Sequence, residues 1–301
     1  MGQRQNRRAV RSAVRGPAFR LIPFACLLAG VTVCRAQTPV ASLSPADAQA
    51  LVNRALANEL RATEDTSHPM RYVLHKTTPR LTSTKEIVET KDGEVARLTS
   101  IFDKPLSEQA EQQEEARLDA LSHNPGSQRH RKQSEDADTA RALKVLRALP
   151  NAFVYQYAGT ADSTPGAAEK FTFRPNPKFS PPDLETEILT EMSGEILVDR
   201  ARERVTRLEG HLENDVDFGW GILGRLNKGG SIRIDQAEVG GDLWRTVHFQ
   251  MKMSGRVVIR TRVFDTTEDE TQFAPVPVGM GYQQAIEMLR TPSEGPGSGA
   301  K

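Results

Sequence analysis

The sequence predicts an α+β fold in which a strongly curved antiparallel sheet, an unclosed barrel, wraps around helices and carries a helical hairpin insertion. Apolar and polar residues alternate in long runs over the second half of the chain, and this period of two is typical of a sheet with one buried face. Three other segments, near residues 45–60, 107–149 and 282–289, show helical spacing instead. Since the apolar face of such a sheet must be covered, we expect helices in its hollow.

The first 36 residues have the layout of a secretory signal peptide. They contain seven arginines and no lysine or acidic residue. Their apolar run, residues 21–33, is shorter than the about 20 residues that a membrane-spanning helix needs. Small residues, Cys34 and Ala36, stand before Gln37 as at a cleavage site. We therefore expect cleavage before Gln37 and a periplasmic or secreted mature protein with no membrane-spanning segment.

Cleavage of this segment would change the net charge and the cysteine content of the chain. The whole chain has 40 basic and 39 acidic residues, a net charge of +1; without the seven arginines it has 33 basic and 39 acidic residues, a net charge of −6. Both cysteines, Cys26 and Cys34, are lost as well. This excludes disulfides, cysteine-bound metal and thiol catalysis in the mature chain. The acidic balance argues against a nucleic-acid partner.

The mature chain begins with a well-marked helix. Ser44 can cap it, Pro45 suits its first position, and Asp47 stands where a capping box places an acid. Its apolar stripe comprises Ala48, Leu51, Val52, Ala55, Leu56 and Leu60. Strand-like segments follow at residues 70–74, 86–90 and 94–98, the last two joined by Lys91-Asp92-Gly93, which predicts a hairpin.

Residues 104–150 differ from their surroundings, because they are rich in Glu, Gln, Ala and Arg and contain no aromatic residue. We expect Ser107 to cap a first helix and Pro150 to stop a second one. Apolar residues gather in the last turns of the second helix: Ala142, Val145, Leu146 and Leu149. The segment is therefore predicted to be a helical hairpin anchored at one end, either a solvated surface insertion or an arm that binds a partner.

From residue 152 onward the pattern is almost entirely that of strands. They are expected over residues 153–157, 170–173, 188–192, 195–199, 204–212, 231–239, 243–253 and 256–268. In the last strand we expect Val257, Ile259 and Val263 on one face and Arg256, Arg260 and Arg262 on the other. A short helix and a frayed tail over residues 291–301 complete the chain, so we predict a single domain over residues 37–290.

Few sequence motifs indicate a catalytic, metal-binding or cofactor-binding site. Residues 219–224 match the spacing G-x-G-x-x-G, but no strand–helix–strand unit surrounds them, so no dinucleotide site is expected. The six histidines lack metal-binding spacing. We predict no cofactor, no metal and no catalytic residue. A hydrolase that uses paired carboxylates is the weakest hypothesis, since acids that alternate along strands are typical of a solvated face.

The loop over residues 218–226 is unusual because bulky apolar residues alternate with glycines. It either folds back to fill the core or forms a flexible flap over a hydrophobic cavity, for which glycine supplies backbone freedom. The second hypothesis gives the candidate ligand-binding residues. They are Phe171, Phe173, Trp220, Leu223, Phe249, Met251 and Met253 for an apolar chain, with Arg225 or Lys228 for an anionic headgroup.

Gly194-Glu195-Ile196-Leu197-Val198-Asp199, followed by residues 204–210, resembles periplasmic lipoprotein-sorting carriers, in which one strand ends in Val-Asp or Ile-Asp and the next carries Arg. The resemblance covers about residues 44–275. It implies an unclosed antiparallel barrel with helices in its hollow and a cavity for acyl chains. The helical insertion departs from the simple carriers. Residues 173–182 and 218–231 also resemble secreted bacterial proteins for which no activity is established.

We therefore expect an exported, non-enzymatic protein that binds a lipid or acyl chain, free or on an acylated protein, in the hollow of the sheet. The alternative is an envelope protein that interacts with another protein or acts as a sensor, with a filled core and no ligand cavity. The presence of a cavity separates these two hypotheses. The sequence leaves the ligand and the oligomeric state open.

Overall fold

The computed structural model describes residues 43–163, 166–218, 224–257 and 260–291, and the side chains of Val257 and Arg260 are not among the described parts. The chain divides into two units, residues 1–39 and 40–301, and every described residue belongs to the second. The expected signal peptide, nearly all of the expected tail, and the candidate residues Trp220 and Leu223 lie outside the described residues.

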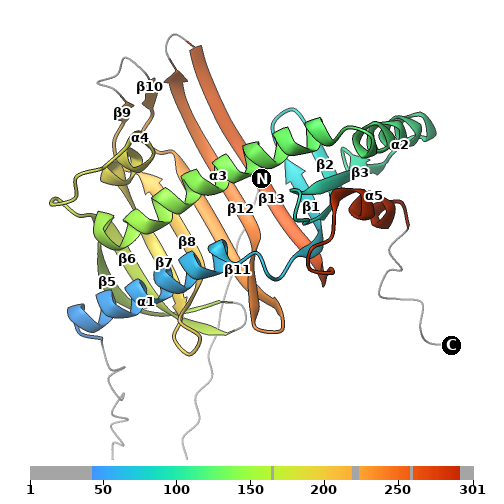
Figure 1. Ribbon diagram of the computed structural model, residues 1–301. Coiled ribbons are helices and arrows are strands. Elements are labelled where there is room, and N and C mark those ends of the chain that lie inside the picture. Colours follow the sequence, from blue (N-terminus) through green and yellow to red (C-terminus); the bar gives the residue numbers. More distant parts are fainter. Residues whose placement is uncertain (1–42, 164–165, 219–223, 258–259, 292–301) are drawn as a thin grey trace, which may run out of the picture. The chain divides into compact units, whose positions relative to one another are not determined.

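The described strands form one antiparallel sheet with two free ends (Figure 1). Its order is β4-β3-β2-β1-β13-β12-β11-β8-β7-β6-β5, and a side branch runs from β12 through β10 to β9. The strands are β1 (Met70–Thr77), β2 (Thr82–Val88), β3 (Val95–Ile101), β4 (Lys104–Pro105), β5 (Phe153–Asp162), β6 (Ala167–Pro175), β7 (Met192–Asp199), β8 (Arg204–Leu212), β9 (Val216–Phe218), β10 (Gly224–Leu226), β11 (Ser231–Gly240), β12 (Leu243–Val257) and β13 (Arg260–Pro275). The order places β13, the last strand, beside β1, the first.

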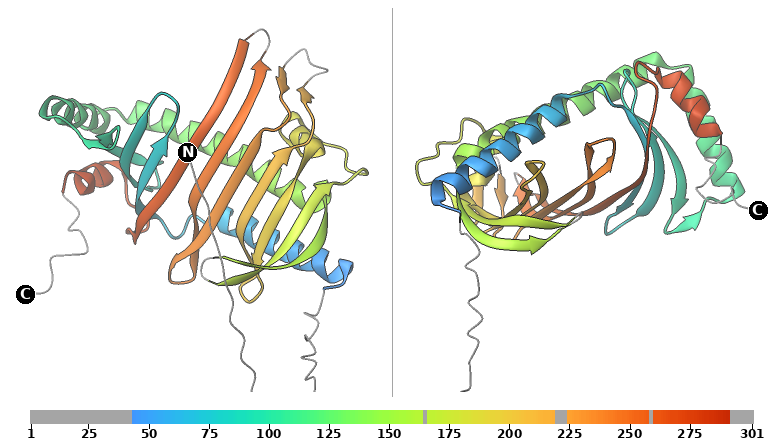
Figure 2. Two further views of the ribbon diagram at one scale, coloured as in Figure 1. Left: turned by 180° about the vertical axis from the view of Figure 1, so that it is seen from behind. Right: turned by 90° about the horizontal axis from the view of Figure 1, so that it is seen from below.

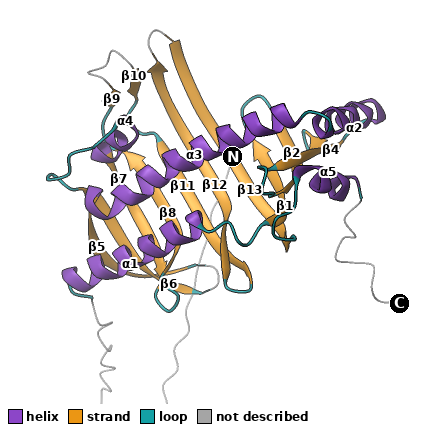
Figure 3. Ribbon diagram, in the orientation of Figure 1, coloured by secondary structure: helices purple, strands orange, loops and turns teal. Residues whose placement is uncertain are grey.

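The helices are α1 (Pro45–Glu64), α2 (Glu108–Ser122), α3 (Pro125–Ala152), α4 (Leu184–Glu187), the 3₁₀ helix η1 (Ile188–Glu191) and α5 (Tyr282–Arg290). Helices α1 and α3 lie on the hollow face of the curved sheet, whereas α2 and α5 pack on the opposite face of β2 and β3 (Figures 2 and 3). The predicted fold class, an α+β protein with a large open antiparallel sheet, is confirmed. Among the described residues, no helix has both the length and the hydropathy that crossing a bilayer requires.

Helix α1 begins as its sequence predicts. The Ser44 side chain accepts a hydrogen bond from the Asp47 N–H, and Pro45 takes the first helical position. The predicted stripe is buried as far as Leu56, whereas Leu60 is half-buried and Glu59 is buried in its place. The reason is that Glu59 faces a guanidinium on the sheet, which is described below.

Two local predictions are wrong. Residues 188–191 form a helical turn rather than a strand, because the Asp183 side chain accepts a hydrogen bond from the Thr186 N–H and starts a helix there. Pro150 lies inside α3, which continues to Ala152. In the final turn of a helix, proline disturbs only the few hydrogen bonds that remain, so the helix can pass through it.

The turn between β12 and β13 also differs from the prediction. β12 runs through Gly255 and Arg256 to Val257, so Arg256 belongs to β12 and Arg262 to β13. Met253 lies opposite Phe264, and Gly255 lies opposite Arg262. Since opposite residues of antiparallel strands share a face, Arg262 and Phe264 lie on the face of buried Met253, whereas Val263 lies on the other face and is 68% exposed. Arg262 and Val263 lie on opposite faces as expected, but the expected grouping is wrong, because Val263 shares its face with Arg256 rather than with Val257.

Two separate hydrophobic clusters hold the helices to the sheet. The larger one packs α1 and the end of α3 on β5, β6, β7 and β8, with Leu51, Leu56, Phe171, Phe173 and Ile196 among its members. The smaller one packs α2 and α5 on β2 and β3, with Val88, Val95, Leu118, Ile286 and Leu289 among its members. Between the clusters, the middle of α3 is polar, so the central strands face a hollow that apolar side chains do not fill.

Candidate functional site

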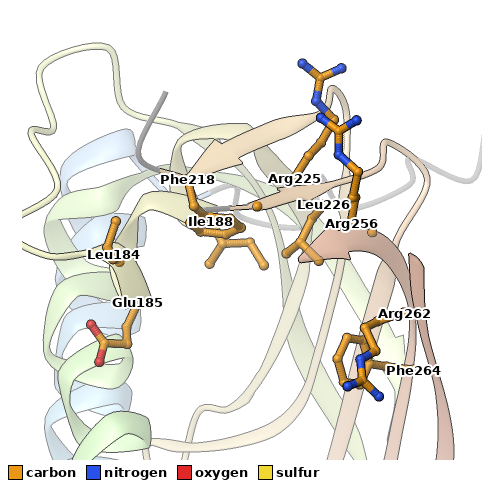
Figure 4. Close-up of a pocket in the computed structure, with 11 residues that line it drawn as sticks. Leu184, Glu185, Ile188, Phe218, Arg225, Leu226, Arg256, Arg262 and Phe264 are labelled. Atoms are coloured by element: carbon orange, nitrogen blue, oxygen red, sulfur yellow. The ribbon is translucent and has the colours of Figure 1, made fainter. Parts of the chain in front are cut away.

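An apolar pocket of about 350 Å³ lies where the β9–β10 branch meets β12 and β13. Its walls come from α4, η1, β9, β10, β12 and β13. They are Leu184, Glu185, Ile188, Phe218, Gly224, Arg225, Leu226, Gly255, Arg256, Arg262 and Phe264 (Figure 4). Leu184 is 48% exposed and Phe264 is 42% exposed, although both are large apolar side chains. Their surface is therefore available to a ligand.

Glycine shapes this apolar pocket by letting two strands approach closely. Gly255 on β12 pairs with Leu226 on β10. A Cβ atom on Gly255 would lie 2.3 Å from the Arg225 backbone oxygen, which is too close for any side chain. Gly255 therefore brings β10 against β12. Since neither Gly255 nor Gly224 has a side chain, part of the wall stays open.

The three arginines at this site differ in their surroundings. Arg225 and Arg256 extend side by side away from the apolar walls, whereas Arg262 lies beside Phe264 (Figure 4). Arg225 binds Asp217 through Nε at 2.6 Å and Nη2 at 2.8 Å, and it contacts Asp215 at 3.3 Å. These hydrogen bonds hold the pKa of Asp217 below its usual value and raise that of Arg225. Among the described residues, Arg262 has no ion-pair partner, so its charge is available to an anion.

The predicted ligand-binding residues are spread over different environments. Phe171, Phe173 and Met253 are buried in the larger cluster, and Met251 packs against it. Phe249 is half-buried on β12. Arg225 lines the apolar pocket, whereas exposed Lys228 does not, and its backbone N–H donates to Asp215 at 2.8 Å.

Sequence reasoning missed most of the side chains that line the apolar pocket: Leu184, Ile188, Phe218, Leu226, Arg262 and Phe264. One signal could have found part of the set. The loop over residues 218–226 was identified as unusual, and Phe218 and Leu226 are its two ends. Residues 219–223 between them lie outside the described residues. The contributions of α4 and β13 are long-range and have no local pattern.

A second, polar hollow of about 560 Å³ lies beneath α1 and α3, over the central strands. Its walls include Glu59, Asp65, His68, Glu89, Glu94, Lys132, Glu135, Arg204, Trp244 and Arg245. Most of the wall surface of this hollow is polar, whereas that of the apolar pocket is almost entirely apolar. The described residues contain no group of three or more histidine or acidic side chains placed to hold a metal ion.

A buried ion pair closes one end of the polar hollow. Glu59 on α1 accepts two hydrogen bonds from Arg204 on β8, from Nε at 2.8 Å and from Nη2 at 3.0 Å. It also accepts one from the Val205 N–H at 2.9 Å. The Arg204 guanidinium lies 5.5 Å from the ring centre of Trp244, a cation–π distance. These contacts hold α1 against the sheet through two charged side chains, Arg204 and Glu59, that are almost fully shielded from solvent.

Half-buried carboxyl groups gather around the other end of the polar hollow. Burial, followed by the charge of Glu94, raises the pKa of Glu270 to about 8. Burial also raises the pKa values of Glu89 and Glu94. The Tyr72 hydroxyl donates to Glu94 at 3.1 Å, and the Glu94 N–H donates to Glu135 of α3 at 3.0 Å. This end therefore holds groups that favour the neutral form.

No protein-family model and no curated protein matches the chain. Among solved structures, the chain resembles a domain from Vibrio parahaemolyticus described as an outer membrane lipoprotein-sorting protein domain. The two share 9% sequence identity at a TM-score of 0.31, and the match covers 80% of this chain and 100% of that domain. A TM-score of 0.31 is too low for this similarity to support a function.

Proposed function

We propose that this protein is an exported, non-catalytic binding protein that takes an anionic amphiphile, such as a fatty acid or the acyl chain of a lipid, into the apolar pocket. The pocket itself supports this proposal. Its volume of about 350 Å³ falls in the range of small-molecule sites, which are mostly apolar with few polar groups. Leu184, Ile188, Phe218, Leu226 and Phe264 would contact the chain, and Arg262 would meet the anionic head.

The site differs from the one expected from the sequence. Phe171 and Phe173 lie in the packed core, and the hollow of the sheet is polar at its centre. The ligand would therefore bind at the end of the sheet near β9 and β10, with its chain against α4 and η1. Export is supported by the sequence of residues 1–36, which carries the arginine-rich and apolar regions of a signal peptide.

The test is the binding of a fluorescent fatty acid, together with native mass spectrometry of the protein after purification. We expect one fatty acid per chain. Leu184→Gln, at a 48% exposed wall position, should weaken binding, whereas Leu81→Gln, at a 42% exposed position outside the pocket, should not. Equal affinities for both variants, or no uptake by the unmodified chain, would exclude this site.

The alternative hypothesis, an interaction module with a filled core, is favoured by one observation. The larger cluster is tightly buried, with Ala48, Val52, Phe171 and Ile196 at 0% exposure. If the protein takes up no amphiphile, this packed end of the molecule is consistent with a protein that binds its partners through its surface.

A further inference from the structure

Within the described part of the chain, the outer edge of β13 has no partner strand along part of its length. β1 pairs with β13 only from Thr267, opposite Thr77, to Pro275. The preceding residues 261–266 pair with β12 on their other side, but no described strand pairs with them on the side of β1. Figure 1 shows the ends of β12 and β13 running past α3. An open strand edge presents unpaired N–H and C=O groups that can pair with another strand.

A groove follows this edge. It has a volume of about 550 Å³ and is bounded by residues 261–266 and by the turn at Thr78, Pro79 and Arg80. Val263 is 68% exposed and Phe264 is 42% exposed along it. Proteins usually protect such edges with charges, bulges or a cover. Here two large apolar residues are exposed on consecutive positions of a strand whose outer edge no described strand covers, which fits an edge that is covered by a partner.

We propose that β13 pairs with β13 of a second copy of this chain, antiparallel and across a two-fold axis through Val263. A two-fold axis perpendicular to the sheet makes the two edge strands antiparallel and keeps each face of the sheet on its own side. In this register Val263 lies opposite its own copy, Arg262 lies opposite the partner's Phe264, and Thr261 lies opposite the partner's Asp265. The contact joins two open sheets into one.

The side chains favour this register over its neighbours. Two valines pair on one face, and a guanidinium meets an aromatic ring on the other. An axis through Arg262 would instead place two arginines opposite each other, which is destabilising. An axis through Phe264 would place Val263 opposite Asp265.

The pairing has a consequence for the apolar pocket. Arg262 and Phe264 line both the apolar pocket and the groove. In the dimer the partner's Phe264 would therefore lie beside Arg262 at the open side of the pocket. Val263 lines the groove but not the apolar pocket, so a change at Val263 tests the dimer without altering the proposed ligand site.

The test is cross-linking of the full chain carrying Cys26→Ser and Cys34→Ser, which has no other cysteine. Opposite residues of an antiparallel pair have Cα atoms about 4.5–5.5 Å apart, within the range that a disulfide bridges. Val263→Cys should therefore form a disulfide-linked dimer on mild oxidation. The matched control is Val278→Cys, at a 73% exposed valine outside the groove, which should stay monomeric.

Sedimentation of the unmodified chain gives the second measurement. Because two short strands bury less area than a standard interface, we expect a dissociation constant on the order of 100 μM. Val263→Asp should place two carboxylates at the axis and weaken the dimer about tenfold or more. Its thermal unfolding midpoint and its fatty-acid affinity should be unchanged.

Several results would overturn the proposal. They are a chain that stays monomeric well above that concentration, a dimer that persists in Val263→Asp, and equal cross-linking at positions 263 and 278. A different protein cross-linked at position 263 in place of a second copy would also overturn it. Loss of fatty-acid binding with an intact dimer would count against the proposed function alone, so the two failures can be told apart.

Discussion

The apolar pocket and the polar hollow lie against the same sheet but are lined by different kinds of side chain. The apolar pocket depends on glycines that bring two strands together and on aliphatic and aromatic walls. The polar hollow depends on buried charges, with the Glu59–Arg204 pair at one end and carboxyl groups at the other. The elements that cover each region of the sheet therefore decide whether the cavity there is apolar or polar. Where α4 and the β9–β10 branch approach, the wall is apolar, and beneath the middle of α3 it is polar.

The largest effect is expected from the buried ion pair. Glu59→Ala removes both hydrogen bonds to Arg204 and the one to Val205, and it leaves a buried guanidinium without its partner. Breaking such a pair costs about 3–5 kcal/mol of unfolding free energy, which chemical denaturation measures. The control is Glu64→Ala on the same helix, whose pair with Arg147 is exposed, and it should cost about 0–1 kcal/mol. Equal costs would mean that the Glu59 pair does not anchor α1.

The next effect is a dependence of stability on pH. The folded-state pKa of Glu270 is raised above its unfolded value of 4.5 to about 8, so folding binds a proton at this group. Its stability contribution is full below about pH 4.5 and is lost as the pH rises through 8. We expect Glu270→Gln to raise the unfolding free energy at pH 8 by about 2–4 kcal/mol, with little change near pH 4.5.

Denaturation at several pH values measures this, with Glu287→Gln, at an exposed side chain on α5, as the control. The raised pKa values of Glu89 and Glu94 act in the same direction. The lowered pKa values of Asp65 and Glu114 have the opposite effect, but they act at more acidic pH. An unfolding free energy that stays level or rises between pH 5 and pH 8 would contradict a half-buried acidic end of the polar hollow.

A smaller effect is expected at Gly255. Gly255→Ala places a Cβ atom against the Arg225 backbone and must push β10 away from β12. Overpacking of this kind costs about 1–3 kcal/mol, and the displaced wall should also reduce fatty-acid affinity. Gly166→Ala, at a glycine with open space around it, is the control for both measurements. Unchanged fatty-acid binding in Gly255→Ala would separate the β10–β12 contact from the apolar pocket.

The smallest effect distinguishes the two cavities as ligand sites. Leu184→Gln removes part of the apolar contact at a half-exposed position, so it should weaken fatty-acid binding about fivefold, or about 1 kcal/mol. The matched variant in the polar hollow is Thr246→Ala, which should leave the affinity unchanged because the ligand does not reach it. Fluorescence titration measures both. A loss in Thr246→Ala alone would move the ligand to the polar hollow.

Local patterns along the chain are enough to predict the elements whose signals come from neighbouring residues. The cap at Ser44 and the hairpin between β2 and β3 depend on neighbouring residues, and they form as expected. The period of two along the second half of the chain was enough to predict the open antiparallel sheet. These features follow from backbone geometry and from the need to bury one face of each strand.

The two cavities, in contrast, depend on contacts between elements that are far apart in the sequence. Gly255 had the pattern of a turn residue, yet it lies within β12 because the β10 backbone approaches it. β12 ends at Val257, four residues later than expected, and the pairing of Gly255 with Arg262 puts Arg262 rather than Val263 at the apolar pocket. Leu184 and Ile188 are distant in sequence from Phe264, and they line one pocket with it only because α4 and η1 approach β13. Contacts between distant elements leave no local period in the chain, so no pattern along it could predict the pocket that they form.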